Sequence, residues 1–120
     1  LSSTAAEYVA FSMAMRELLP MRALVDEIAS KLKLKFVTKS LIFSTIFEDN
    51  QGCLSMVNVP KLCTRNKYLS LKYHFFRSHI GESKGIVAKY IWMHEQKADI
   101  FTKGLGPEQF QSIRKLLIGW

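Results

Sequence analysis

Three acidic residues occur where buried or cleft positions are expected, and carboxylates in such positions can bind metal ions. Glu7 lies in the first turns of an expected helix, Asp49 ends an expected hydrophobic strand, and Asp99 follows a second strand. Ligands of open α/β sheets gather outside the carboxyl ends of strands, and hard oxygen donors there suit Mg²⁺ or Mn²⁺. For any one residue taken alone a simpler role is favoured: helix-dipole partner, N-cap or surface charge.

The elements that must position these residues follow an order typical of an α/β layer fold with helices flanking a sheet. They are predicted from apolar periodicity, caps and breakers. Ser3 or Thr4 is expected to cap the first helix, and Pro20 is expected to kink or break it unless the local geometry compensates. The expected elements are helix 4–29, connector 31–39, strand 41–47, helix 50–57, helix 68–80, strand 86–92, helix 95–103 and helix 108–118.

Two strands alone do not make a stable sheet. We therefore expect the remaining strands to come from sequence preceding Leu1.

Composition predicts one basic domain. The chain has 120 residues, is 48% hydrophobic and carries 17 Lys and Arg against 10 Asp and Glu, a net charge of +7. This balance favours contact with phosphates or anionic surfaces but does not identify the partner. No apolar run approaches the roughly 20 residues of a membrane helix, and the first residues lack a signal-peptide pattern, so we expect no membrane association.

Cysteines and histidines provide no chemistry of their own in this sequence. Cys53 and Cys63 lack CxxC spacing and the density of a disulfide scaffold, which predicts small core residues in a reducing, intracellular compartment. His74 and His79 are five residues apart and His94 lies further along the chain, a spacing that favours no zinc site.

Polar and basic residues near Asp49 could contact a nucleic acid. Amide groups both donate and accept hydrogen bonds, so Asn50 and Gln51 are candidates for sugar and base edges; a purely capping role is about equally favoured. Basic residues interleaved with tyrosines predict a track for phosphates, although a solvated helix face explains them nearly as well. These basic residues are Lys61, Arg65, Lys67, Lys72 and Arg77.

Five segments, covering nearly the whole chain, resemble the ribonuclease H domain of copia-type retrotransposon polyproteins. SSTAAEYVAFSMAMREL resembles the start of that family's first helix, and EDNQGCLSMVNVP its central strand-to-helix motif. KYHFFRSHI resembles the following basic and aromatic helix, EQKADIFTKGL the last acidic helix, and QFQSIRKLLIGW the terminal helix. The segments occur in the family's order and at compatible distances.

The resemblance implies a ribonuclease H-like fold, a mixed sheet flanked by helices, in a single partial domain over residues 1–120. It implies four carboxylates holding two Mg²⁺ (or Mn²⁺) ions about 4 Å apart, with Glu7, Asp49 and Asp99 matching the second, third and fourth. The first aspartate, on the opening strand, has no counterpart, so the isolated chain is expected to be nearly inactive.

The implied partners are an RNA–DNA hybrid and the reverse transcriptase and integrase regions of the same polyprotein. The implied location is a virus-like particle in the cytoplasm, or the nucleus.

Some positions depart from the family pattern. Ala5 stands where the family usually has a second glutamate, and Tyr68-Leu-Ser70 stands where it commonly has His-Ile-Asp. Trp92-Met-His94 replaces a Pro-Thr-Glu-like entry whose threonine caps the last acidic helix, and Lys97 replaces an apolar residue there. Losing a cap typically costs about 1 kcal/mol, so Asp99 is expected to be held less rigidly.

Two alternatives remain open from the sequence. A decayed or domesticated copy that binds nucleic acid without hydrolysing it is favoured by these departures and by Pro20. An unrelated basic α/β interaction module would have the three carboxylates far apart.

Overall fold

The computed structural model describes residues 2–33, 42–59 and 71–120. This part of the chain is mostly helical and contains a small parallel sheet, so it is a mixed α/β chain. The elements in chain order are α1 (Ser3–Lys31), β1 (Ser44–Glu48), α2 (Gln51–Asn58), the 3-10 helices η2 (Leu71–Tyr73), η3 (Phe75–His79) and η4 (Glu82–Lys84), β2 (Ile86–Tyr90), the 3-10 helix η5 (Met93–Glu95), α3 (Asp99–Thr102) and α4 (Pro107–Ile118).

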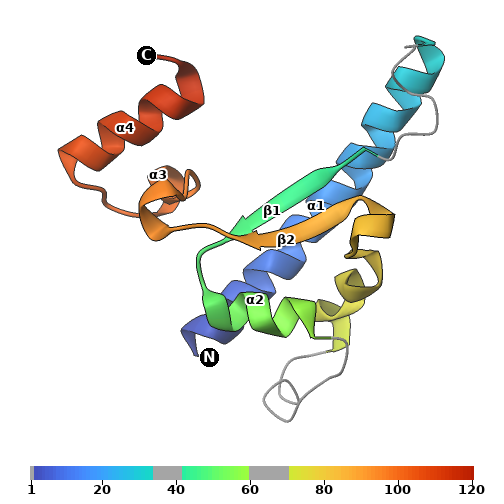
Figure 1. Cartoon of the computed structure of the whole chain (residues 1–120), viewed down its shortest axis with the longest axis horizontal. Helices are drawn as coiled ribbons and strands as arrows, with labels where there is room; N and C mark the ends of the chain where they lie inside the picture. The colour runs from blue at the N-terminus through green and yellow to red at the C-terminus, as the bar shows by residue number, and fades with distance from the viewer. Residues whose placement is uncertain (1, 34–41, 60–70) are drawn as a thin grey trace.

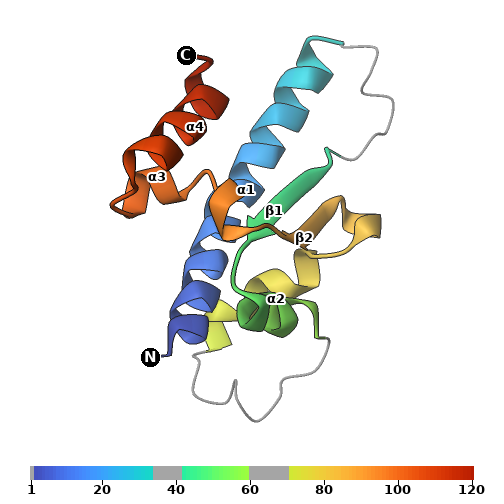
Figure 2. The ribbon, with the colours of Figure 1, turned by 60° about the vertical axis from the view of Figure 1, so that its left-hand side comes forward.

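The sheet consists of β1 and β2, which pair in parallel with Ser44 opposite Ile86 and Glu48 opposite Tyr90. The long helix α1 runs along one side of this pair, and the crossover from β1 to β2 contains α2 and the 3-10 helices (Figures 1 and 2). Arg22 fixes α1 to the start of the strands, because its Nη1 donates to Ser44 Oγ at 2.6 Å and to the Gly85 carbonyl at 2.8 Å.

Helix α1 begins at Ser3, with Ser2 rather than Ser3 or Thr4 as its cap, and it continues through Pro20. The Ser2 hydroxyl accepts a hydrogen bond from the Ala5 N–H at 3.2 Å and caps the helix. Of the expected kink or break at Pro20, the break does not occur, since one helix spans Ser3–Lys31, in line with the predicted range 4–29. Proline deprives the Arg16 carbonyl of its helical donor, but Arg16 and Pro20 are both exposed, so water can replace that donor.

Four other predictions match the structure to within a few residues. The helix expected at 50–57 is α2 with Asn50 as its cap, and the helix expected at 108–118 is α4. The strands expected at 41–47 and 86–92 are β1 and β2, each shorter than predicted. The expected connector overlaps α1 at Lys31, and its residues 34–39 lie outside the described ranges.

Two predicted α-helices are replaced by shorter elements. The helix expected at 68–80 is η2 followed by η3 over its described residues. Packing prevails over helical spacing here, because the interruption at His74 lets its ring hydrogen-bond to Tyr8 while Phe76 enters the core. The helix expected at 95–103 is reduced to η5 and the single turn α3, which begins at Asp99 with Ala98 at its N-cap position and no side-chain cap.

The turn before β2 is flanked by two glycines in backbone conformations that other residues rarely adopt. Gly81 has φ 148° and ψ 150°, an extended conformation with positive φ. Gly85, at the other end of η4, has the left-handed conformation with φ 69°. L-residues with a side chain avoid such angles, so the 3-10 turn η4 depends on glycine at both ends.

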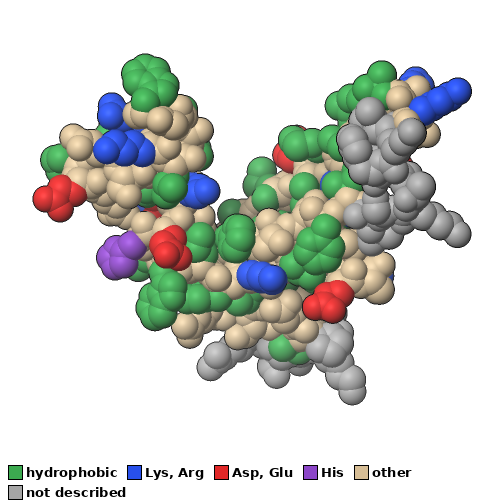
Figure 3. Space-filling view, turned by 45° about the horizontal axis from the view of Figure 1, so that its top comes forward, with side chains coloured by type: hydrophobic (Ala, Val, Ile, Leu, Met, Phe, Trp, Pro, Cys, Tyr) green, Lys and Arg blue, Asp and Glu red, His purple; other side chains and the backbone are tan. Residues whose placement is uncertain are grey.

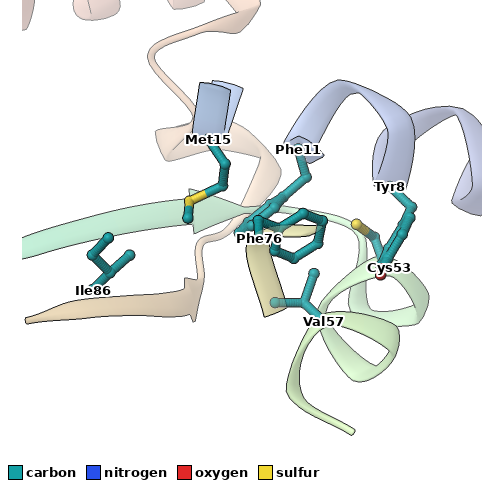
Figure 4. Packing of buried hydrophobic residues seen from close by; sticks show 7 residues of the cluster. All are labelled: Tyr8, Phe11, Met15, Cys53, Val57, Phe76 and Ile86. Carbon is teal, nitrogen blue, oxygen red and sulfur yellow. The ribbon is translucent and has the colours of Figure 1, made fainter. Parts of the chain in front are cut away.

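The core lies where α1, α2, η3 and β2 meet. Tyr8, Phe11 and Met15 from α1 pack with Phe76, which is completely buried, and with Ile86 (Figure 4). The Phe76 ring lies 5.3 Å from that of Tyr8 and 5.1 Å from that of Phe11, both tilted. Within the described ranges, no helix is both long enough and apolar enough to cross a membrane.

Replacing Phe76 with alanine is expected to destabilise the protein strongly. The change leaves a cavity between α1 and α2, and such changes cost about 3–5 kcal/mol. Urea denaturation followed by circular dichroism measures the loss. Phe101→Ala is the matched control, since Phe101 is 78% exposed and its loss should change the free energy of unfolding by less than about 0.5 kcal/mol. Equal losses for the two variants would contradict this description of the core.

Candidate functional site

Asp49 and Asp99, which come from different elements, share one cation in the structure. Asp49 follows β1 directly, and Asp99 is the first residue of α3. The Lys103 ammonium lies 2.9 Å from Asp99 Oδ1 and 3.7 Å from Asp49 Oδ2. The side chains of Asp49 and Asp99 are only 17% and 7% exposed, whereas that of Lys103 is 49% exposed. Two of the three predicted ligands are therefore near neighbours.

Glu7 acts on the same place through its charge. It lies on α1 with an exposed side chain. The hydrogen bond to Asp99 raises the pKa of Lys103, and the negative charges of Asp99, Asp49 and Glu7 raise it further. Lys103 therefore contacts two of the three predicted carboxylates, and Glu7 affects it only through its charge.

The donor set suits a small hard ion bound by few protein ligands. Among the residues that the structure describes, no group of three or more histidine, cysteine, aspartate or glutamate side chains is arranged to hold a metal ion. Mg²⁺, however, commonly binds through one or two carboxylates together with water and substrate phosphates. Asp49 and Asp99 match that smaller set, and the Lys103 ammonium stands in for the cation between them.

Glu48 is a carboxylate at this site that the sequence analysis missed. It is the last residue of β1 and is 6% exposed. Its Oε1 accepts a hydrogen bond from the Asn50 N–H at 3.0 Å. Burial raises the pKa of Glu48, and the charges of Glu7 and Asp49 add to the rise. No local pattern indicated it, because alternation along the strand would place the hydrophobic Phe47 inside and Glu48 outside, whereas Phe47 is 51% exposed and Glu48 is buried.

Cys53 is buried against Glu48, which confirms its predicted role as a small core residue. It is fully buried in α2. Burial raises the pKa of its thiol well above the usual range, and the charge of Glu48 and a hydrogen bond between the two side chains act in the same direction. A thiol held protonated in this way is a poor nucleophile. Cys63 lies outside the described residues.

Asn50 joins the site to the start of α1. Its Oδ1 accepts from the Cys53 N–H at 2.9 Å, which caps α2, and from the Thr4 hydroxyl at 3.4 Å. Gly52 allows this close approach, since a Cβ there would lie 3.0 Å from Thr4 Oγ1. The capping role is therefore observed. The Asn50 amide nitrogen and the exposed Gln51 side chain form no hydrogen bond within the described ranges.

Only two of the five residues of the predicted phosphate track, Lys72 and Arg77, lie in the described ranges. Lys61, Arg65 and Lys67 lie outside the described residues. Lys72 is exposed, with its ammonium 4.9 Å from the Tyr73 ring centre. Arg77 lines a cavity of about 500 Å³ beside the end of α2, and no described residue forms a hydrogen bond with its buried Nη2. Lys72 is thus exposed beside Tyr73, whereas one nitrogen of the Arg77 guanidinium is buried.

No protein-family model matches the chain, and no solved structure matches it. The interpretation of the site therefore depends on the motifs and on the geometry described above.

Replacing Glu48 with glutamine is expected to raise the melting temperature most at neutral pH. A raised pKa in the folded state means that Glu48 costs no stability below its unfolded pKa of about 4.3 and destabilises the fold as the pH rises through the folded value. Glutamine keeps the oxygen that accepts from Asn50. Thermal unfolding at pH 4 and pH 7, with a metal chelator present, measures the difference.

The control for this experiment is Glu17→Gln, because Glu17 is exposed on α1. The Glu48 variant should gain a few degrees over the wild type at pH 7 and much less at pH 4. A gain that does not change with pH, or that Glu17→Gln reproduces, would show that burial does not perturb Glu48.

Proposed function

We propose that this chain is the carboxyl-terminal part of a ribonuclease H-type domain, which cleaves the RNA strand of RNA–DNA hybrids within a copia-type retrotransposon polyprotein. The observation that carries the proposal is the shared Lys103 ammonium. Asp49 and Asp99 belong to two motifs far apart in the sequence, and both are ion-paired to that one group. Glu7, from a third motif, acts on the same group through its charge.

The arrangement of the elements supports a larger sheet than the one described. Within the described ranges β1 pairs only with β2, so its other edge carries backbone groups without strand partners. Apolar side chains gather on the face shown in Figure 3, over the sheet and α4. Phe47, Trp92 and Leu116 are 51%, 66% and 60% exposed. Further strands beside β1 would cover such an edge and such a face.

The site is proposed to bind divalent ions through a small number of carboxylates. Asp49 and Asp99, with Glu7 nearby, would hold divalent ions, which in such sites activate the attacking water and stabilise the leaving oxygen. The chain's own contribution is to hold Asp49 at a fixed strand end, because Asn50 caps α2 directly after it. The first aspartate of the resembled family is missing, so we propose that the isolated chain has little or no activity.

Substrate contacts are proposed for the groups beside Asp49. An RNA–DNA hybrid presents 2′-hydroxyls in a wide, shallow minor groove. The Asn50 amide nitrogen can donate to such a hydroxyl while its oxygen caps α2, and Gln51 is exposed at the same helix start. The exposed Lys72 is proposed to contact phosphate. Reverse transcriptase and integrase regions of the same polyprotein are the proposed protein partners, inside the cell.

A second candidate is a remnant that binds nucleic acid but does not cleave it. It is favoured because a lysine lies between the two aspartates. An unrelated α/β module is less well supported, since it requires widely separated carboxylates.

Cleavage of a labelled RNA–DNA hybrid in Mg²⁺ tests the proposal. The chain alone is expected to show little or no cleavage, and a version extended upstream to include the missing strands and aspartate is expected to cleave. Asp49→Asn in the extended version should reduce the rate by at least about a hundredfold, because a carboxylate ligand is lost. Gel analysis of the labelled RNA measures the rates. If the extended version does not cleave the hybrid either, the non-cleaving binding remnant is favoured.

Hybrid binding without Mg²⁺ tests the phosphate contact of Lys72. Lys72→Gln should weaken binding and lower the slope of log affinity against log salt by about one. Lys115→Gln removes the same charge from α4, away from Lys72, and should leave the slope unchanged. Fluorescence anisotropy at several salt concentrations measures both. Identical slopes for all three proteins would place Lys72 outside the interface.

A further inference from the structure

Lys103 connects α3 to the end of β1 through its ion pairs with Asp99 and Asp49. Both oxygens of Asp99 lie within hydrogen-bond distance of its ammonium, at 2.9 Å and 3.0 Å. The same ammonium reaches Asp49 at the end of β1. Within the described ranges, no other cation forms an ion pair with either aspartate. A further link to β1 comes from just before α3, where Gln96 Nε2 donates a long hydrogen bond to the Phe47 carbonyl, at 3.5 Å.

The burial of Asp99 explains why it needs this partner. Asp99 is 5% exposed, and a buried carboxylate is costly unless it is paired. Asp99 and Lys103 are four residues apart across the single turn of α3, a spacing that brings their side chains together. Lys103 itself is half exposed on a long flexible stem, so its ammonium can move into solvent when something else neutralises the aspartate.

The negative charges around Lys103 exceed its single positive charge, so the site could accept a divalent cation. The two aspartates carry two negative charges and Glu7 supplies a third nearby, while Lys103 supplies one positive charge. A divalent ion bound to Asp99 would lie within a few ångströms of the ammonium, and the two positive charges would repel each other strongly. An ion and the observed position of Lys103 are therefore mutually exclusive.

We propose that Lys103 is a cationic clasp, which holds Asp99 to Asp49 when no ion is bound and which a divalent ion must displace. This inference rests on the proposed metal site. Lys103 is a positioning residue, because it acts through the two aspartates. It stabilises the ion-free protein and at the same time lowers the apparent affinity for the ion, since binding includes the work of breaking its ion pairs.

Mn²⁺ binding to the whole 120-residue chain tests the proposal, with free Mn²⁺ measured by electron paramagnetic resonance. Lys103→Gln is expected to bind Mn²⁺ on the order of tenfold more tightly than the wild type, a change typical of groups that support metal ligands. In a metal chelator the same variant should melt at a lower temperature than the wild type. Lys103→Arg keeps the charge and should bind no more tightly than the wild type.

Two further variants separate the possible outcomes. Lys97→Gln removes an equal charge from an exposed position of the same segment and should leave the Mn²⁺ affinity unchanged. Asp99→Asn should abolish the binding. If binding depends on Asp99 but Lys103→Gln does not tighten it, the clasp is overturned and the proposed metal site stands. If no variant shows binding that depends on Asp99, the metal site itself is wrong, and the clasp inference fails with it.

Discussion

The packing of Phe76 between α1 and α2 is the interaction on which the described structure depends. A parallel pair of five-residue strands cannot hold itself together, since isolated two-stranded sheets are marginal even with a tight turn. Phe76 contacts the rings of Tyr8 and Phe11, and the Tyr8 hydroxyl hydrogen-bonds to His74 Nδ1 at 2.8 Å. This contact holds the crossover between β1 and β2 against α1. The position of β1 against α1 follows from it.

The same packing fixes one half of the candidate site. Where β1 ends, Glu48 accepts from the Asn50 N–H, and the Asn50 side chain caps α2 and contacts Thr4 of α1. Asp49 lies between these two anchored residues, so its backbone is held by both neighbours. Asp99 has no comparable support, because α3 is one turn long and starts without a side-chain cap. Its placement depends on burial and on Lys103.

The sequence predicted the elements whose signals are local. Asn50 was one of the candidate caps, and α2, α4 and both strands were located within a few residues, because capping and apolar runs are read directly from neighbouring residues. The helices expected at 68–80 and 95–103 were wrong for different reasons. Around His74, the contact with Tyr8, which is far away in the sequence, determines the backbone conformation. Around Asp99, the helix has no side-chain cap and extends for only one turn.

The site shows the same division. That Asp49 and Asp99 approach each other was predicted, through a family resemblance and the rule on strand ends. Lys103 was not predicted, although it lies four residues after Asp99, because lysine at that spacing usually marks a solvated helical pair worth about 0.3–0.5 kcal/mol. Glu48 was missed because its burial follows from the crossing of α1, α2 and β1, which no local pattern encodes.

Exposed apolar surface connects the fold to the site. Leu116 of α4 and Phe47 of β1 face a cavity of about 350 Å³, which also contacts Gln96 and Lys97. Only residues 103–106 separate α3 from α4, so a partner that covers this surface would also affect the position of Asp99. If further strands extend the sheet beyond β1, α4 gains an apolar face to pack on, and Asp99 is then held by packing. Without them the placement of Asp99 depends on the charge of Lys103, which is the weaker constraint.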